Sequence, residues 1–233
     1  MPTNIVLIGM DIFLEWFGST GFMSRRKATD VFSEWAEKGK DKGMENGHAA
    51  SVHAMLKLAG IPRSETYSAV DVGCGNGWVC RLLAHDEAST RVVGVDGSEV
   101  MIAKAKTIDT DGEYHVTVLP DWEPSEKFDL VHSMEFLYYL HDPKAMLKKL
   151  HDNWMTSGGM LVAGIDHYQE NKNSLGWPDA LNVHMTTLSM DEWKTAMVEA
   201  GFTDVELHQV AATDSFIGTC LLYTSDAADE EDS

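Results

Sequence analysis

The sequence predicts one α/β domain in which a mostly parallel sheet is covered by helices on both faces. Three observations support this prediction. Short β-branched segments alternate with helical ones, which is typical of βαβ units. A glycine-rich turn at residues 73–77 connects the first predicted strand directly to a helix, and such turns build ligand sites at the ends of parallel strands. A chain of 233 residues can bury one core of this kind but not two.

The chain before the sheet is expected to form an extension and a helical cap. Residues 1–29 are the predicted extension; its apolar run, residues 5–17, contains two acids and follows no lysine or arginine. The run therefore fits neither a signal peptide nor a membrane span. Asp30 is a predicted N-cap of a short helix, and apolar residues at helical spacing over 49–58 predict a second helix. Residues 30–60 are the predicted cap.

The sheet is expected to have seven strands inside a domain that spans residues 30–219. The predicted strands are residues 69–72, 91–95, 115–118, 128–133, 160–164, 205–210 and 215–219, and the helices between them are residues 78–84, 99–106, 142–152 and 190–200. The last helix starts with the capping-box spacing of Ser189 and Glu192 and ends at Gly201, a natural C-cap. This alternation of strands and helices predicts parallel pairing.

The charge balance excludes some partners. Eighteen Lys and Arg residues against 37 Asp and Glu residues give a formal net charge of −19, and such a field repels polyphosphate chains. We therefore expect no nucleic-acid partner, and no membrane partner either. The three cysteines are an odd number without metal-ligand spacing, which predicts a reducing, cytoplasmic location and no metal site.

The last residues, 220–233, are predicted to be a non-native tail. Residues 220–230 resemble, letter for letter, the translation of a transposon adapter used to prepare sequencing libraries. On this interpretation the native gene is cut near Thr219, and the tail carries no evolved function. An ordinary acidic C-terminal tail is the alternative.

The turn after the first predicted strand reads Asp-Val-Gly-Cys-Gly-Asn-Gly-Trp at residues 71–78. Its glycines let the backbone approach a ligand, and the helix that follows offers unpaired N–H groups. A dinucleotide site needs the pattern Gly-x-Gly-x-x-Gly, but Trp78 stands in the place of the third glycine. The spacing therefore argues against a nicotinamide or flavin cofactor.

This turn resembles the first motif of the class I S-adenosylmethionine-dependent methyltransferases, and the resemblance extends over residues 30–219. Residues 128–135 resemble the fourth motif of that family, and residues 200–202 resemble the turn before its last hairpin. The resemblance implies a Rossmann-like fold and S-adenosylmethionine as the cofactor. Residues 35–48 resemble a segment of an uncharacterised subgroup of small methyltransferases, in whose relatives the matching region caps the cofactor.

The resemblance also implies a set of cofactor-binding residues. Asp71 would hold the methionine ammonium, and Asp96, at the end of the second predicted strand, would accept both ribose hydroxyls. Met101 is expected either against the adenine or in the core. The full expected set is Asp71, Gly73, Cys74, Gly75, Gly77, Asp96, Gly97, Met101 and Ser133.

Three candidate catalytic residues lie in segments that are expected to surround a methyl acceptor. Glu135 and Tyr139 follow the fourth predicted strand, and His48 lies in the cap. Each has a plainer alternative: a helix cap for Glu135, a core aromatic for Tyr139 and a solvated residue for His48.

The predicted function is methyl transfer from S-adenosylmethionine to a small-molecule acceptor. The identity of the acceptor, the methylated atom and the oligomeric state remain open. Two alternatives belong to other classes of protein: a module that binds S-adenosylmethionine without activity, and a nicotinamide-dependent oxidoreductase, which Trp78 disfavours.

Overall fold

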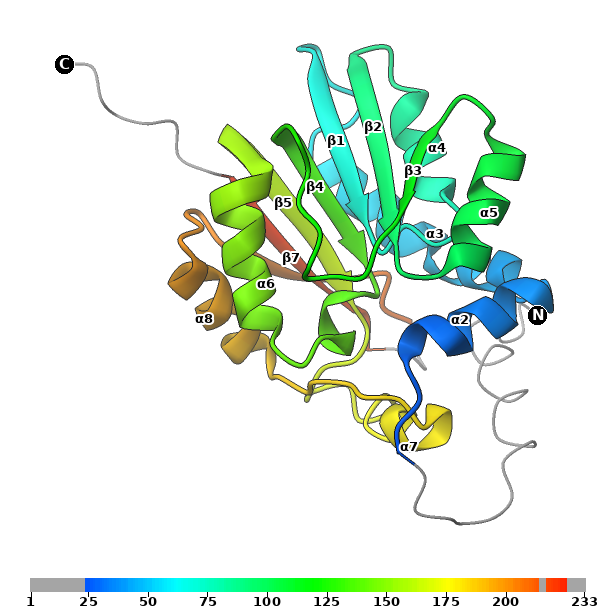
Figure 1. The fold of residues 1–233 in the computed structure, drawn as a ribbon. Coiled ribbons are helices and arrows are strands. Elements are labelled where there is room, and N and C mark those ends of the chain that lie inside the picture. The colour runs from blue at the N-terminus through cyan, green and yellow to red at the C-terminus, as the bar shows by residue number, and fades with distance from the viewer. Residues whose placement is uncertain (1–23, 214–216, 226–233) are drawn as a thin grey trace.

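The computed structural model describes residues 24–213 and 217–225, which form one seven-stranded sheet flanked by helices (Figure 1). The strands are β1 Tyr67–Val72, β2 Ser89–Asp96, β3 Glu113–Val116, β4 Phe128–Met134, β5 Met155–Ile165, β6 Glu206–Val210 and β7 Thr219–Ser225. Their order is β3-β2-β1-β4-β5-β7-β6. Strands β1 to β5 are parallel, and β7 is antiparallel to both β5 and β6. This arrangement confirms the predicted fold class.

Helices cover both faces of the sheet and one of its ends. They are α2 Ala28–Glu37, α3 Asp41–Leu58, α4 Trp78–Ala84, α5 Glu99–Ile108, α6 Pro143–Lys149, α7 Trp177–Leu181 and α8 Met190–Ala200. Helix α8 has the predicted capping box between Ser189 and Glu192, and it ends at Gly201 in the left-handed conformation. No helix in the described part of the chain is long and apolar enough to cross a membrane.

Side chains of the central strands alternate between two apolar cores, one on each face of the sheet. Val70 and Val72 of β1 face the core built with α6 and α8, whereas Ala69 packs with α3 and α4. Strand β5 divides Leu161 and Val162 in the same way. Successive side chains of a strand point to opposite faces, so a parallel strand that is covered on both sides needs apolar residues throughout. This requirement explains the β-branched runs in the sequence.

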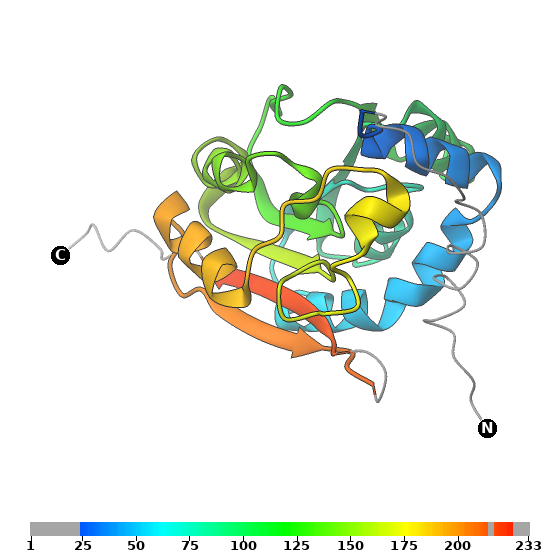
Figure 2. The same cartoon turned by 90° about the horizontal axis from the view of Figure 1, so that it is seen from below.

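Helices α2, α3 and α7 lie around the end of the sheet where the parallel strands terminate (Figure 2). Ser33 of α2 is hydrogen-bonded to Ser98, just after β2, at 2.7 Å. Asp41 at the start of α3 is buried and accepts hydrogen bonds from Asn76 at 2.9 Å and from Lys104 at 2.5 Å. The predicted N-terminal helical cap is therefore confirmed, and it is tied to the turn after β1.

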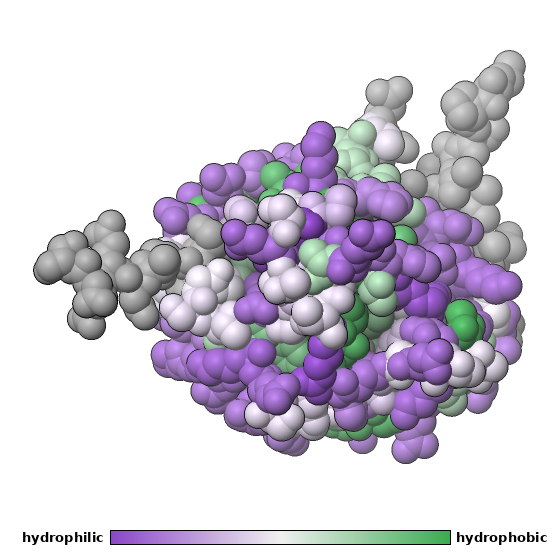
Figure 3. Space-filling view, turned by 90° about the horizontal axis from the view of Figure 1, so that it is seen from above, coloured by the Kyte–Doolittle hydropathy of each residue, from purple (hydrophilic) through white to green (hydrophobic). Residues whose placement is uncertain are grey.

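Figure 3 shows the surface at the opposite end of the sheet. At the amino ends of the parallel strands the molecule presents mainly hydrophilic side chains with scattered apolar ones (Figure 3). Ligands of open α/β sheets bind beyond the carboxyl ends of the strands. The cap and the site therefore have to be considered together, at the end shown in Figure 2.

Several element boundaries differ from the prediction. Helix α2 begins at Ala28 with Lys27 at its N-cap, so the prediction that Asp30 caps this helix is wrong. The predicted helix 142–152 is α6 followed by a π-helix, Leu150–Trp154. Helix α3 begins at Asp41 rather than at residue 49, because its polar first turns are held by tertiary contacts that apolar periodicity does not register. The last strand is β7, Thr219–Ser225, rather than residues 215–219. Residues 220–225, predicted to belong to a non-native tail, thus occupy a position inside the sheet. Residues 1–23 of the predicted extension and residues 214–216 lie outside the described part of the chain.

Leu222 offers a test of the position of β7. Its side chain is fully buried in the core that α6 and α8 cover. Leu222→Ala is expected to lower the free energy of unfolding by about 2–5 kcal/mol, because it removes buried apolar contacts and leaves a cavity. Urea denaturation followed by circular dichroism measures the change.

Val198→Ala on the exposed side of α8 is the matched control and should change stability by less than about 0.5 kcal/mol. Deletion of residues 220–233 removes all of β7 except Thr219, so β6 loses its partner strand and the melting temperature should fall further. An unchanged unfolding midpoint in Leu222→Ala would contradict the burial of β7.

Candidate active site

The turn between β1 and α4 is shaped by three glycines in the left-handed conformation. Gly73, Gly75 and Gly77 have φ angles of 78°, 53° and 75°. A Cβ atom on Gly73 would lie 2.7 Å from Phe136 Cβ, and one on Gly77 would lie 2.5 Å from the Tyr114 ring, so only glycine fits at either position. At Gly75, in contrast, no described residue other than its two chain neighbours lies within 4 Å of such a Cβ. The middle of the turn therefore faces open space, where a cofactor can approach the backbone.

Asp96 adjoins this turn from the end of β2. One of its carboxylate oxygens accepts a hydrogen bond from the Gly75 N–H at 3.0 Å, and the other accepts one from the Ser98 N–H at 2.7 Å. Burial raises the pKa of this carboxyl. Two backbone amides thus fix the carboxylate, and each oxygen keeps acceptor capacity for a ribose hydroxyl. Gly97 packs against α2, where a Cβ would lie 2.6 Å from the Thr29 methyl group.

A buried pair, Asp71 and His132, lies between β1 and β4. The two residues are partners in the register of these strands, and His132 Nδ1 is 2.7 Å from Asp71 Oδ1. His132 Nε2 is buried without a hydrogen-bond partner in the described structure. Sequence reasoning singled out Asp71 but missed His132. The pairing depends on the register of two strands whose residues are 61 positions apart, and no local pattern reports it.

Three further residues of the expected cofactor set are buried near the turn. The Ser133 hydroxyl donates to the Val72 carbonyl at 2.9 Å. Burial raises the pKa of the Cys74 thiol. The Met101 N–H donates to the Ser98 hydroxyl, the N-cap of α5, and the Met101 side chain is buried. These contacts hold the turn and the start of α5 in place. Direct contact of these three side chains with a cofactor stays a prediction.

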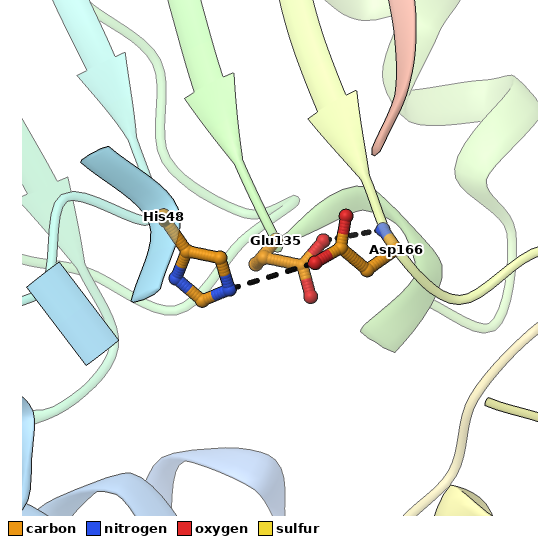
Figure 4. Close-up of side chains that lie close together, drawn as sticks. All are labelled: His48, Glu135 and Asp166. Atoms are coloured by element: carbon orange, nitrogen blue, oxygen red, sulfur yellow. Dashed lines mark hydrogen bonds and ion pairs between the residues drawn. The ribbon is translucent and has the colours of Figure 1, made fainter. Parts of the chain in front are cut away.

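His48, Glu135 and Asp166 meet where β4 and β5 end (Figure 4). His48 projects from α3, Glu135 follows β4 and Asp166 follows β5. His48 Nε2 lies 3.7 Å from Asp166 Oδ2, and the Asp166 N–H donates to Glu135 Oε1 at 2.5 Å. The fold thus brings two of the three predicted catalytic residues together. Asp166 was not among them, because one acid at the start of a long loop gives no signal on its own.

Burial determines the charges in this cluster. It raises the pKa of both Glu135 and Asp166, and the neighbouring Asp166 charge raises that of Glu135 further. Burial also lowers the pKa of His48, although the charge of Asp166 opposes this shift. Each group is thus displaced away from its charged form. Such perturbed groups are common in functional sites.

Tyr138 and Tyr139 belong to a 3₁₀ turn, Leu137–Tyr139, beside the cluster. The Tyr138 hydroxyl donates to Glu135 Oε2 at 2.6 Å, and the two tyrosine hydroxyls are hydrogen-bonded to each other at 3.3 Å. The Tyr139 ring packs edge-on against Phe32 of α2, with ring centroids 5.4 Å apart. Tyr139 therefore links the loop after β4 to the cap.

The alternative assignment of Glu135 as a helix cap is wrong. The N-cap position of the 3₁₀ turn is Phe136, and no side chain caps that turn. The Glu135 carboxylate instead bridges the loop after β4 and the first residue after β5. Glu135 also has a left-handed backbone, with φ of 58°, a conformation that is uncommon for residues other than glycine.

The strand order, the glycine turn after β1 and the acid at the end of β2 together define the class I S-adenosylmethionine-dependent methyltransferases. A family model described as a methyltransferase domain matches residues 24–207. The chain therefore belongs to this methyltransferase family, and S-adenosylmethionine is its cofactor. The open space at Gly75 and the fixed carboxylate of Asp96 fit that cofactor.

Curated relatives are similar over part of their length. The trans-aconitate 2-methyltransferase of Escherichia fergusonii is 26% identical over 145 residues, which are 56% of this chain and 57% of the relative. The enzyme of the same name from Variovorax paradoxus is 28% identical over 119 residues, which are 51% of this chain and 46% of the relative. The match thus spans about half the length of these relatives.

Solved structures are similar over most of the chain. A protein described as a methyltransferase, in complex with the Trm112 methyltransferase activator of Haloferax volcanii, is 28% identical with a TM-score of 0.74, covering 86% of this chain and 98% of that one. The N-methyltransferase NodS of Bradyrhizobium japonicum, in complex with S-adenosyl-L-homocysteine, is 19% identical with a TM-score of 0.60, covering 77% and 86%. The second likeness shows the fold alone.

Substitution of Asp96 tests the cofactor site. Asp96→Ala removes an acceptor for charged or polar donors, so the affinity for S-adenosylmethionine should fall at least about tenfold. Isothermal titration calorimetry measures the affinity. Asp111→Ala, in the exposed connection between α5 and β3, is the matched control and should bind normally. Unchanged affinity in a folded Asp96→Ala variant would contradict the assignment.

Proposed function

We propose that the chain methylates a small-molecule acceptor that binds between the cap and the cluster of His48, Glu135 and Asp166. When bound, S-adenosylmethionine supplies a methyl group that its sulfonium already activates. The chain's own residues then have to hold the acceptor in line and exclude water. One contact carries the proposal: Phe136, the residue after Glu135, packs directly against Gly73 of the cofactor turn. The cluster therefore lies next to the place where the cofactor is held.

The proposal assigns different tasks to the two sides of the site. Gly75 and Asp96 bind the cofactor from the ends of β1 and β2. His48, Glu135 and Tyr139 orient the acceptor from the cap and from the loop after β4. Tyr139 is suited to this task because it contacts both segments, through Phe32 and through Tyr138.

Two further observations support a small acceptor and a cytoplasmic location. The curated relatives are named for methylation of trans-aconitate, a small molecule, which favours a small acceptor over a macromolecular one. The three cysteines are unpaired and buried, as is usual in a reducing compartment, and we place the protein in the cytoplasm on that ground.

Substitutions at the acceptor side test the proposal. An acceptor is first identified with labelled S-adenosylmethionine and pooled metabolites. His48→Ala and Tyr139→Phe should then lower the methylation rate about tenfold or more and leave S-adenosyl-L-homocysteine affinity unchanged, since groups that orient an acceptor act mainly in the transition state. Steady-state kinetics and calorimetry provide the two measurements.

His53→Ala, on the same helix as His48, is the matched control and should keep the parental rate. Equal rates in all variants would reduce His48 and Tyr139 to packing residues. A parent chain that transfers no methyl group to any member of a broad panel would favour a binding module without activity.

We also propose a protein partner at the β3 edge of the sheet. Strand β3 is one of the two terminal strands of the sheet; Val116 at its end and Val118 just after it expose 47% and 66% of their surface. An edge strand offers unpaired backbone groups to an added chain. The solved neighbour in complex with a Trm112 activator supports a partner of that kind for this chain.

Binding to purified Haloferax volcanii Trm112 tests this second proposal. Val118→Asp should weaken the complex at least about tenfold, because it places a charge in an apolar contact. Val198→Asp, at an equally exposed valine on α8, should bind like the parent. Surface plasmon resonance measures both affinities. Failure of the parent chain to bind, or equal weakening by both substitutions, would contradict a partner at β3.

A further inference from the structure

The cluster of His48, Glu135 and Asp166 has the composition of a metal site. It combines one imidazole with two carboxylates, and one candidate ligand atom from each residue lies within 4.8 Å of the others. The ion pairs of the described residues give neither carboxylate a lysine or arginine partner. Two acids held this close repel each other when both are charged, so a bound cation would stabilise the cluster.

His48 is oriented as a ligand. It projects from α3, and the Met44 carbonyl one turn earlier partly offsets the lowering of its pKa by burial. Nε2 points at the carboxylates (Figure 4). The 3.7 Å between Nε2 and Asp166 Oδ2 is too long for a direct hydrogen bond. It fits two ligands of one ion, since two atoms that are each about 2.1 Å from a metal lie roughly 3–4 Å apart.

Asp166 supplies an independent observation. Its side chain is only 9% exposed, and its Oδ1 atom has no hydrogen-bond partner in the described structure. The Thr219 hydroxyl, hydrogen-bonded to Ser51 at 2.6 Å, also lies near this carboxyl and opposes the effect of burial on its pKa. The carboxylate is turned toward His48 and Glu135 (Figure 4). A buried carboxylate oxygen without a donor is costly, and a cation in the cluster would remove that cost.

We propose that His48, Glu135 and Asp166 together bind one divalent cation of the Mn²⁺ or Zn²⁺ type. Imidazole and carboxylate ligands suit these ions. The sequence predicted no metal site because its three cysteines lack ligand spacing. This ligand set contains no cysteine, and its residues are far apart in the chain, so spacing alone does not reveal it.

The surroundings of the cluster match those of metal ligands. The Tyr138 hydroxyl donates to Glu135 at 2.6 Å, an outer contact of the kind that orients a ligating carboxylate. Three protein ligands leave at least one coordination position open. The role of the ion rests on the proposed function. An acceptor oxygen or nitrogen would bind the ion at the open position, beside the glycine turn. His48 and Glu135 would then act on the acceptor through the ion.

Direct metal binding tests the inference. The full chain is stripped with a chelator, dialysed against Mn²⁺ or Zn²⁺ and analysed by mass spectrometry of the bound metal. We expect one ion per chain, and Mn²⁺ should raise the melting temperature, because a ligand that binds only the folded state stabilises it. Glu135→Gln and Asp166→Asn should each weaken the affinity for Mn²⁺ at least about tenfold in calorimetric titrations.

His115→Gln is the matched control, because His115 also pairs with a carboxylate, Glu113, at 3.0 Å, but lies away from the cluster on β3. It should leave metal binding unchanged. Absence of binding for both ions at millimolar concentrations, or retained affinity in both Glu135→Gln and Asp166→Asn, would overturn the inference. Circular dichroism and S-adenosyl-L-homocysteine binding of each variant separate loss of the site from loss of the fold.

Activity distinguishes this inference from the function on which its role depends. Methyl transfer that requires the bound ion supports both. Methyl transfer that proceeds equally in the stripped and the metal-loaded chain would overturn the role of the ion at the acceptor and leave the proposed function intact.

Discussion

The close packing of the glycine turn against its neighbours is the constraint on which the rest of the structure depends. Phe136 and Tyr114 occupy the space that a Cβ atom would need at Gly73 and Gly77. The turn is therefore held between the loop after β4 and the side chain from β3. Any larger residue at either glycine would push these segments apart. Because the turn is held in this position, the Gly75 N–H can donate to Asp96. Glu135, which we propose to face the acceptor, directly precedes Phe136.

Acidic side chains converge around this turn, and each is compensated differently. The hydrogen-bonding partners are Lys104 and Asn76 for Asp41, His132 for Asp71, backbone amides for Asp96, and Tyr138 with a backbone amide for Glu135. Asp166 has His48 at 3.7 Å and the Thr219 hydroxyl nearby, and its Oδ1 atom has no hydrogen-bond partner in the described structure. Burying a carboxylate lowers stability unless its lost hydration is replaced. The two apolar cores supply that stability, and the incompletely compensated Asp166 belongs to the cluster for which we propose a cation.

Local patterns were sufficient for most of the fold. Apolar runs and their alternation with helices located the strands, and the capping box of α8 and its terminal glycine appear where the sequence placed them. The pattern failed where tertiary contacts decide. The first turns of α3 are polar, and a hydrogen bond from Asn76 to Asp41 holds them in place. The predicted last strand ended at Thr219, whereas β7 begins there and its apolar residues come after it.

The sequence by itself determined the fold class, the glycine turn and the acid at the end of β2, because each depends on neighbouring residues and follows from backbone conformation or strand periodicity. Only the tertiary structure decided which side chains meet. His132 joins Asp71 through strand register, and Asp166 joins His48 and Glu135 because a helix of the cap lies over the ends of two parallel strands. These contacts depend on the topology of the sheet and on packing between segments that are distant in the chain. A sequence pattern does not show how far apart such segments lie in the folded protein.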